Sequence, residues 1–209
     1  MNRPLVVLLP VLGLAVALGA QAAPSYRMDS AKSSLRFVAE QTGGKFEGSF
    51  KHFDALIAFS PTDLASSRFD VTVDPASAET QDADRNQTIV GPDFFDVAHF
   101  RTAHFVTTTF RAIDATHFEA TGKLTLRDVT RDVKIAFTFS SRKEGAGEAA
   151  YLAGTADLKR LEFGVGRGDY KDTDTVGDPV QVKFNLRLTP PTHLPDKKIP
   201  TTPSPAQSQ

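Results

Sequence analysis

The feature of this sequence that most constrains its fold is a two-residue alternation of apolar and polar side chains. In residues 118–126, every even-numbered residue is apolar or glycine, and the residues between them are Glu, Thr, Lys and Thr. Residues 69–73 and 180–188 repeat the pattern, and residues 133–139 repeat it with one alanine on the polar side. Because a β-strand points successive side chains to opposite faces, these segments predict antiparallel strands with one face buried and one in water.

Weaker alternation extends the set of predicted strands to eight. Residues 35–40, 44–59, 103–110 and 149–158 complete it. Within residues 44–59 the apolar positions change from even to odd numbers across His52 and Phe53, which indicates a bulge or bend in one long strand. Eight antiparallel strands in a single domain favour an all-β closed barrel or a sandwich.

One segment breaks the alternation. Residues 79–90 are mainly polar and are followed by Gly91 and Pro92. Thr80 followed by Asp82 and Asp84 suits the N-terminus of a helix, where acidic side chains complement the helix dipole. We therefore expect one short helix packed against the strands.

Nearly all the aromatic residues are phenylalanine: the chain has 16 Phe, 3 Tyr and no Trp. Phenylalanine carries no polar group, so this bias indicates enclosed apolar space. An eight-stranded barrel is either filled by its own side chains or holds one small ligand. Small residues on the predicted inner face fit both cases, since they either leave volume or make room for phenylalanines of opposite strands. They are Gly44, Gly48, Ala55, Ala120, Gly122, Gly154 and Ala156.

The two ends of the chain differ in composition from the middle. Residues 1–22 carry a basic start, an apolar run and an Ala-Gln-Ala cleavage site, which predicts a secretory signal peptide. The alternative is a membrane anchor, but the apolar run is shorter than the ~20 residues that a spanning helix needs. Residues 190–209 contain six prolines and no apolar periodicity, which predicts a disordered or polyproline-II tail. Residues 23–189 remain as the folded domain.

Composition and motifs exclude several function classes. Lys and Arg number 24 and Asp and Glu number 25, so the chain lacks the basic excess typical of nucleic-acid binding. The absence of cysteine excludes disulfides, thiolate metal sites and thiol nucleophiles. Residues 172–177 match part of a calcium loop, but Lys183 stands where the bidentate glutamate belongs. The five histidines are scattered, and we predict no catalytic residue, no metal site and no cofactor.

Several short motifs resemble the YceI-like family, and together they extend from about Tyr26 to Leu188. The most specific are Pro92-Asp93-Phe94-Phe95-Asp96 and Leu124-Thr125-Leu126-Arg127-Asp128-Val129-Thr130. The others are residues 33–37, 53–54, 80–85, 163–166 and 176–178.

The resemblance implies an eight-stranded antiparallel, lipocalin-like barrel with a helix against it and a long apolar lumen. It implies binding of a polyisoprenoid or another amphipathic chain, a bacterial periplasmic location and often a homodimer. Some members occur beside or fused to membrane b-type cytochromes, which implies a role related to quinones.

These observations predict a periplasmic binding protein that holds a polyisoprenoid, a quinone or another long apolar chain in the barrel lumen. The alternatives are an adaptor for a membrane b-type cytochrome and an enzyme acting on an isoprenoid-like substrate. Few titratable residues have inward parity, which weighs against the enzyme. By strand parity, the predicted ligand-binding residues are Phe37, Phe46, Phe59, Phe69, Phe95, Phe105, Phe118, Leu124, Phe137, Phe163 and Phe184.

Overall fold

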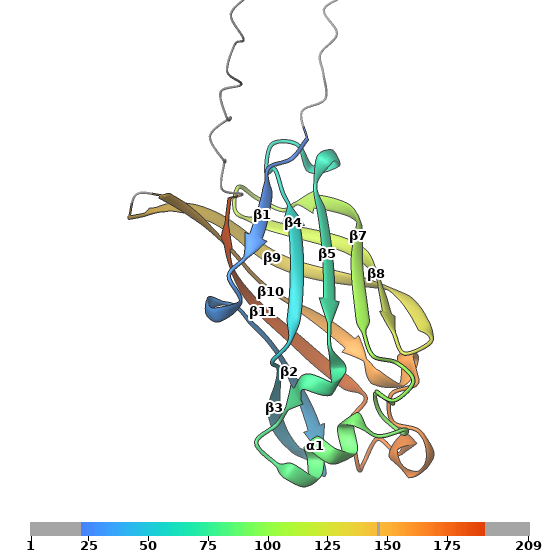
Figure 1. Cartoon of the computed structure of the whole chain (residues 1–209). Coiled ribbons are helices and arrows are strands. Elements are labelled where there is room, and N and C mark those ends of the chain that lie inside the picture. The colour runs from blue at the N-terminus through green and yellow to red at the C-terminus, as the bar shows by residue number, and fades with distance from the viewer. Residues whose placement is uncertain (1–21, 146, 191–209) are drawn as a thin grey trace, which may run out of the picture.

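The computed structural model describes residues 22–145 and 147–190 (Figure 1). Residues 1–21 of the predicted signal peptide and residues 191–209 of the predicted tail lie outside the described residues. The described part contains eleven β-strands, the helix α1 (Ala83–Val90) and several short 3-10 turns. The strands are β1 (Ser25–Met28), β2 (Ser34–Gln41), β3 (Gly44–Phe50), β4 (Phe53–Ala58), β5 (Arg68–Val73), β6 (Ala78–Glu79), β7 (Ala103–Ala112), β8 (His117–Leu126), β9 (Val129–Glu144), β10 (Gly147–Lys159) and β11 (Pro179–Thr189).

These strands form one closed antiparallel barrel. The ring runs β1–β4–β5–β7–β8–β9–β10–β11 and closes where β1 pairs with both β4 and β11. β2 continues the path of β1 along β11 and pairs with β3, and β3 in turn pairs with β6. The prediction of an all-β, eight-stranded barrel with one helix is confirmed, although the short strands β1 and β6 were not anticipated.

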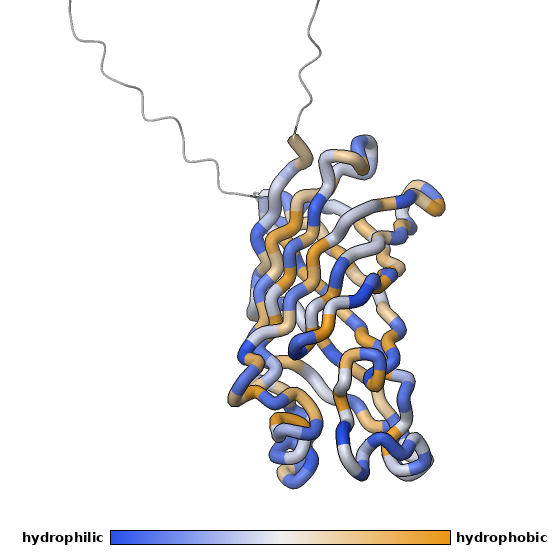
Figure 2. The backbone as a smooth tube through the Cα atoms, turned by 90° about the vertical axis from the view of Figure 1, so that its right-hand side faces the viewer, coloured by the Kyte–Doolittle hydropathy of each residue, from blue (hydrophilic) through white to orange (hydrophobic). Residues whose placement is uncertain are grey.

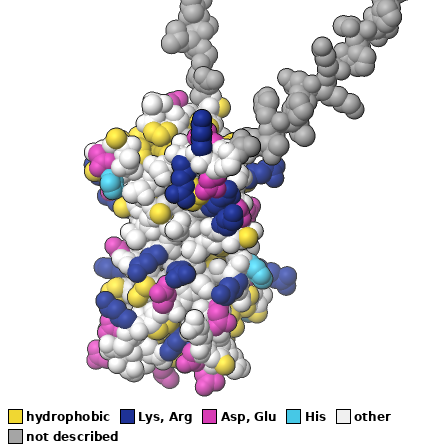
Figure 3. Space-filling view, turned by 90° about the vertical axis from the view of Figure 1, so that its left-hand side faces the viewer, with side chains coloured by type: hydrophobic (Ala, Val, Ile, Leu, Met, Phe, Trp, Pro, Cys, Tyr) yellow, Lys and Arg dark blue, Asp and Glu magenta, His cyan; other side chains and the backbone are white. Residues whose placement is uncertain are grey.

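The predicted change of parity is present at the bend between β3 and β4. On β3, Phe46 and Phe50 point inward and Gly48 lies between them on the same face, and on β4 the side chains at 53, 55 and 57 point inward. Figure 2 shows the resulting alternation of hydrophobic and hydrophilic residues along the strands. Charged side chains of both signs are dispersed over the outer surface in Figure 3, as expected for strands with one face in water.

The helix α1 lies at the lower end of the barrel in Figure 1. The Asp82 carboxylate accepts a hydrogen bond from the Arg85 amide at 2.9 Å and so caps the helix, with Asp84 in the first turn. Ile89 is buried on the face that turns toward the barrel. Within residues 22–145 and 147–190, no helix combines the length and apolarity needed to cross a bilayer.

Candidate ligand cavity

The lower half of the barrel contains an apolar cavity. The centre of a water-sized sphere can move through about 230 Å³ of it, far more than one water needs. The wall comes from the inner faces of the strands, from α1 and from the loops at residues 94–95 and 160–176. All of the described side chains that line it are apolar except Arg160, so the cavity suits a hydrocarbon and offers little to a polar ligand.

Arg160 stands in the wall but directs its charge away from the cavity. Its Nε donates to the Gly177 carbonyl at 3.0 Å, Nη1 to Val165 at 2.9 Å and Nη2 to Val176 at 2.6 Å. Burial lowers the pKa of Arg160, and nearby Asp178 partly offsets that effect. Since an arginine remains protonated in proteins, the buried cation serves to hold the loop of residues 164–177 in place.

A second buried arginine holds the neighbouring turn at the same end, where the Asp93 carbonyl accepts hydrogen bonds from the amides of Gly166 and Arg167. Arg127 Nη1 donates to the carbonyls of Pro92, at 3.0 Å, and of Phe94, and Nη2 lies 3.4 Å from an Asp96 oxygen. Burial lowers the pKa of Arg127, and the neighbouring positive charge of Arg167 adds to this. The turn held by Arg127 presents Phe94 and Phe95 to the cavity.

The structure places eight of the eleven predicted ligand-binding residues in the cavity wall. They are Phe37, Phe46, Phe69, Phe95, Phe105, Leu124, Phe163 and Phe184. Phe59, Phe118 and Phe137 face inward as parity requires, but they lie beyond the cavity and do not line it. For these three, the prediction of a lining role does not hold.

The reason is an aromatic plug that fills the upper half of the barrel. Phe59 is fully buried at its centre, with five other rings at centroid distances of 4.8–5.9 Å. The plug consists of Phe59, Phe69, Phe110, Phe118, Phe137 and Phe139. Phe69 lies at its boundary and also lines the cavity. Strand parity assigns a residue to the inner face but not to a height along the barrel, so it could not separate plug from cavity.

Several wall residues were missed by the sequence reasoning. Phe50 and Phe53 flank the bend and both line the cavity, and their parity on either side of the bend was a usable signal. Arg160 and Val176 enter from loops, where no periodicity marks a buried position.

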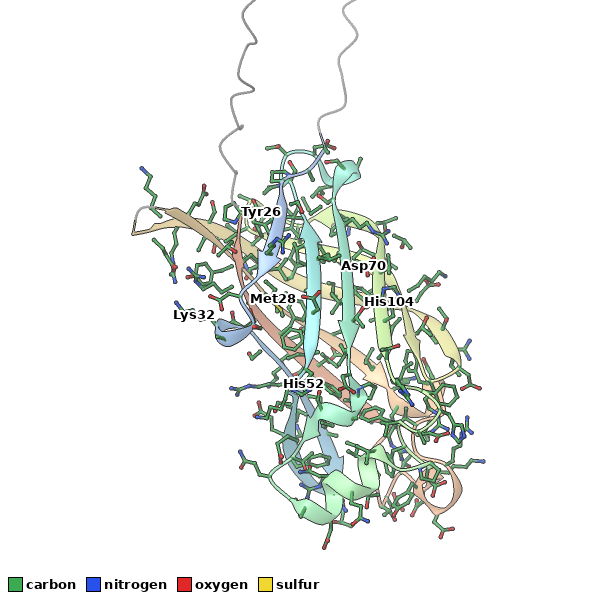
Figure 4. All side chains as sticks on the ribbon, in the orientation of Figure 1. Tyr26, Met28, Lys32, His52, Asp70 and His104 are labelled. Carbon is green, nitrogen blue, oxygen red and sulfur yellow. The ribbon has the colours of Figure 1, made fainter. Side chains whose placement is uncertain are left out.

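Polar clusters lie on the outer surface instead. Asp70 and His104 lie on the neighbouring strands β5 and β7 (Figure 4). His104 Nε2 is 2.6 Å from Asp70 Oδ1, and this hydrogen bond lowers the pKa of Asp70. Both side chains are partly exposed and neither lines the cavity. No group of three or more His, Asp or Glu side chains within the described ranges is arranged to hold a metal ion.

Known proteins share this architecture. A UPF0312 protein of Vibrio parahaemolyticus is 30% identical, over 78% of this chain and 90% of the relative. The crystal structure of Burkholderia cenocepacia BcnA is 34% identical with a TM-score of 0.71, covering 77% of this chain and 98% of BcnA. A polyisoprenoid-binding domain from Saccharophagus degradans, implicated in plant cell wall breakdown, superposes with a TM-score of 0.63 at 15% identity, covering 80% of this chain and 99% of that domain.

The family model for the YceI-like domain matches residues 26–188, a span that runs from β1 to the end of β11 and so contains the whole barrel, the cavity and both buried arginines. The chain therefore belongs to the YceI-like family.

Proposed function

We propose that this protein binds one long apolar chain, such as a polyisoprenoid, the tail of a quinone or a lipid, inside the cavity. The observation that carries the proposal is the cavity itself: it lies inside the barrel and is lined by hydrocarbon side chains apart from Arg160. The Saccharophagus degradans domain of the same fold, described as polyisoprenoid-binding, supports this class of ligand.

Burial of apolar surface supplies the affinity. Transfer from water is worth about 25 cal/mol per Å² of apolar surface. A chain that buries several hundred Å² gains on the order of 10 kcal/mol before the costs of ordering it. Such a site binds tightly but tolerates chemical variation, because it makes few directional contacts.

Binding fits the cavity better than catalysis. General acid–base chemistry needs a titratable group within hydrogen-bond reach of the substrate. Arg160 is the only ionisable side chain in the described wall, and its three nitrogen atoms already donate to backbone carbonyls. A carrier or buffer is therefore the favoured role.

The location and partners extend the proposal. Export directed by residues 1–22 would place the carrier in the periplasm, where a soluble protein can move an isoprenoid or quinone chain through water. Two partners remain predictions from the sequence: a membrane b-type cytochrome, and a second copy of the chain in a homodimer.

Mass spectrometry tests the function directly. The exported mature protein is purified without detergent and measured under native and denaturing conditions. We expect an additional mass in the native spectrum that denaturation releases, and its value gives the class of the ligand. A mass equal to that of the bare chain, unchanged after incubation with isoprenoid lipids, contradicts the proposal.

A further inference from the structure

The width of the cavity depends on a glycine that lies beneath an aromatic ring. Gly48 on β3 is directly opposite Phe37 on β2. A Cβ atom at position 48 would lie 2.3 Å from the tip of the Phe37 ring, closer than any real contact allows. The ring therefore occupies the space that a side chain at position 48 would fill, and it lies flat on the barrel wall.

The neighbouring rings leave Phe37 only one direction in which to move. Phe46 and Phe50 lie two residues before and after Gly48 on the inner face of β3, with ring centroids 6.3 and 5.4 Å from that of Phe37. These two rings pack beside that of Phe37, and the backbone of Gly48 lies beneath its tip. A Phe37 ring lifted off the wall would therefore enter the cavity, which it already lines.

The same arrangement recurs at two other positions in the wall. A Cβ at Gly122 would lie 2.6 Å from the ring of Phe105, and one at Gly154 would lie 2.6 Å from the ring of Phe184. At both positions a backbone carbonyl is equally close or closer, so these glycines are also required by the backbone. At Gly48, by contrast, the three atoms nearest to an added Cβ all belong to the Phe37 ring. A substitution there therefore tests the width of the cavity with less effect on the backbone of the sheet.

We propose that Gly48, with Gly122 and Gly154, sets the width of the cavity so that it accepts methyl-branched chains. This inference rests on the proposed function and names the residues that determine which chains the same site accepts. An isoprenoid carries a methyl branch on every fourth chain carbon and is wider than an unbranched alkyl chain. A cavity whose rings lie flat on glycine accommodates the branches, whereas one narrowed by a lifted ring accommodates only the thinner chain.

The test compares two alcohols of equal main-chain length. Geranylgeraniol has a sixteen-carbon main chain with four double bonds and four methyl branches, and 1-hexadecanol has a saturated, unbranched main chain of the same length. Uptake of each by purified protein is measured by native mass spectrometry and by competition with a fluorescent fatty-acid probe. For Gly48→Ala we expect the affinity for geranylgeraniol to fall about tenfold, since a pocket discriminates by about that much per badly accommodated methyl or methylene group. The affinity for 1-hexadecanol stays within about twofold.

Two further variants make the result specific. Gly44→Ala is the matched control on the same strand, because a Cβ there meets nothing closer than the Gln41 carbonyl at 3.5 Å, and we expect both affinities to be unchanged. The double variant Gly48→Ala/Phe37→Leu removes the ring that the new methyl displaces, so it restores uptake of geranylgeraniol.

The outcomes separate this inference from the function on which it rests. If the unmodified protein takes up neither alcohol, the proposed function fails and the inference with it. If it takes up both, and a folded Gly48→Ala changes the two affinities equally or not at all, the inference alone is overturned. Should Gly48→Ala fail to fold, Phe37→Leu makes the opposite test: the preference for geranylgeraniol over 1-hexadecanol rises, and an unchanged preference overturns the inference.

Discussion

Both halves of the barrel carry phenylalanines on the inner face of antiparallel strands, yet these side chains fill the upper half and leave a cavity in the lower half. In the upper half, Phe59 comes from the chain just beyond β4 and fills the axis of the ring. In the lower half, the rings of Phe37, Phe105 and Phe184 lie on glycines and stay close to the wall. Apolar composition alone therefore does not decide between a core and a cavity; the position of the rings relative to the barrel axis does.

The largest expected effect comes from removing a ring at each end. Phe59→Ala leaves a void at the centre of packed rings, and we expect it to lower the free energy of unfolding by about 3–5 kcal/mol. Phe105→Ala removes a ring that already borders empty space, so the loss is about 1–2 kcal/mol. Urea unfolding of both variants checks the difference, and equal losses would show that the lower half is packed as tightly as the plug.

The upper and lower halves of the barrel also differ in the interactions that stabilise them. The upper half is held by ring packing, whereas residues 164–177 at the lower end are held by backbone hydrogen bonds and by the three hydrogen bonds of Arg160. Arg160→Met leaves three carbonyls without their donor, and we expect a loss of about 2–3 kcal/mol. Arg160→Lys keeps the charge but not the planar fork, so it recovers only part of that loss.

Hydrogen exchange locates the effect of the Arg160 substitutions. Amides of residues 164–177 should exchange faster in Arg160→Met, while amides of β8 and β9 beside the plug keep their protection. Uniform acceleration over the whole barrel would mean that Arg160 supports global stability and not this loop.

Replacing a leucine by the larger tryptophan in each half tests whether the upper half is packed and the lower half hollow. Leu188 is fully buried outside the cavity, and Leu188→Trp should cost about 1–3 kcal/mol through overpacking. Leu124 lines the cavity, so Leu124→Trp should change stability by less than about 1 kcal/mol but fill the space that a ligand needs. Unchanged ligand uptake by a folded Leu124→Trp protein would show that Leu124 does not line the ligand-binding site.

Sequence periodicity predicts the fold well and the cavity only in part, for a physical reason. Alternation identifies which side chains face inward, and it located the bend at which parity changes between Phe50 and Phe53. It contains no information on height along the axis, so Phe118 and Phe137 could not be told apart from Phe105. The buried arginines at 127 and 160 belong to turns, where burial follows from long-range contacts and leaves no local pattern.

The smallest expected effect is that of pH on ligand affinity, because the ionisable side chains of the described residues, apart from Arg160, lie outside the cavity wall. Arg160, the only ionisable residue in the described wall, keeps its charge over the accessible range, so uptake of an uncharged chain should vary by less than about twofold between about pH 5 and 9. A larger change would point to a titrating group that contacts the ligand.

Acid should act on the outer surface first. At the end of β9, next to the turn of the β9–β10 hairpin, a hydrogen bond from Tyr151 and an ion pair with Arg187 lower the pKa of Glu144 to about 2. A carboxylate whose pKa is depressed in the folded state stabilises that state above its ordinary value of 4.5, and the contribution is lost as the pH falls toward 2. Glu144→Gln should therefore reduce the dependence of stability on pH within this window and leave ligand uptake unchanged. Since the hairpin projects beyond the barrel in Figure 1, its loosening in acid should leave the plug and the cavity intact, and coincident loss of ligand and hairpin would show that the two are coupled.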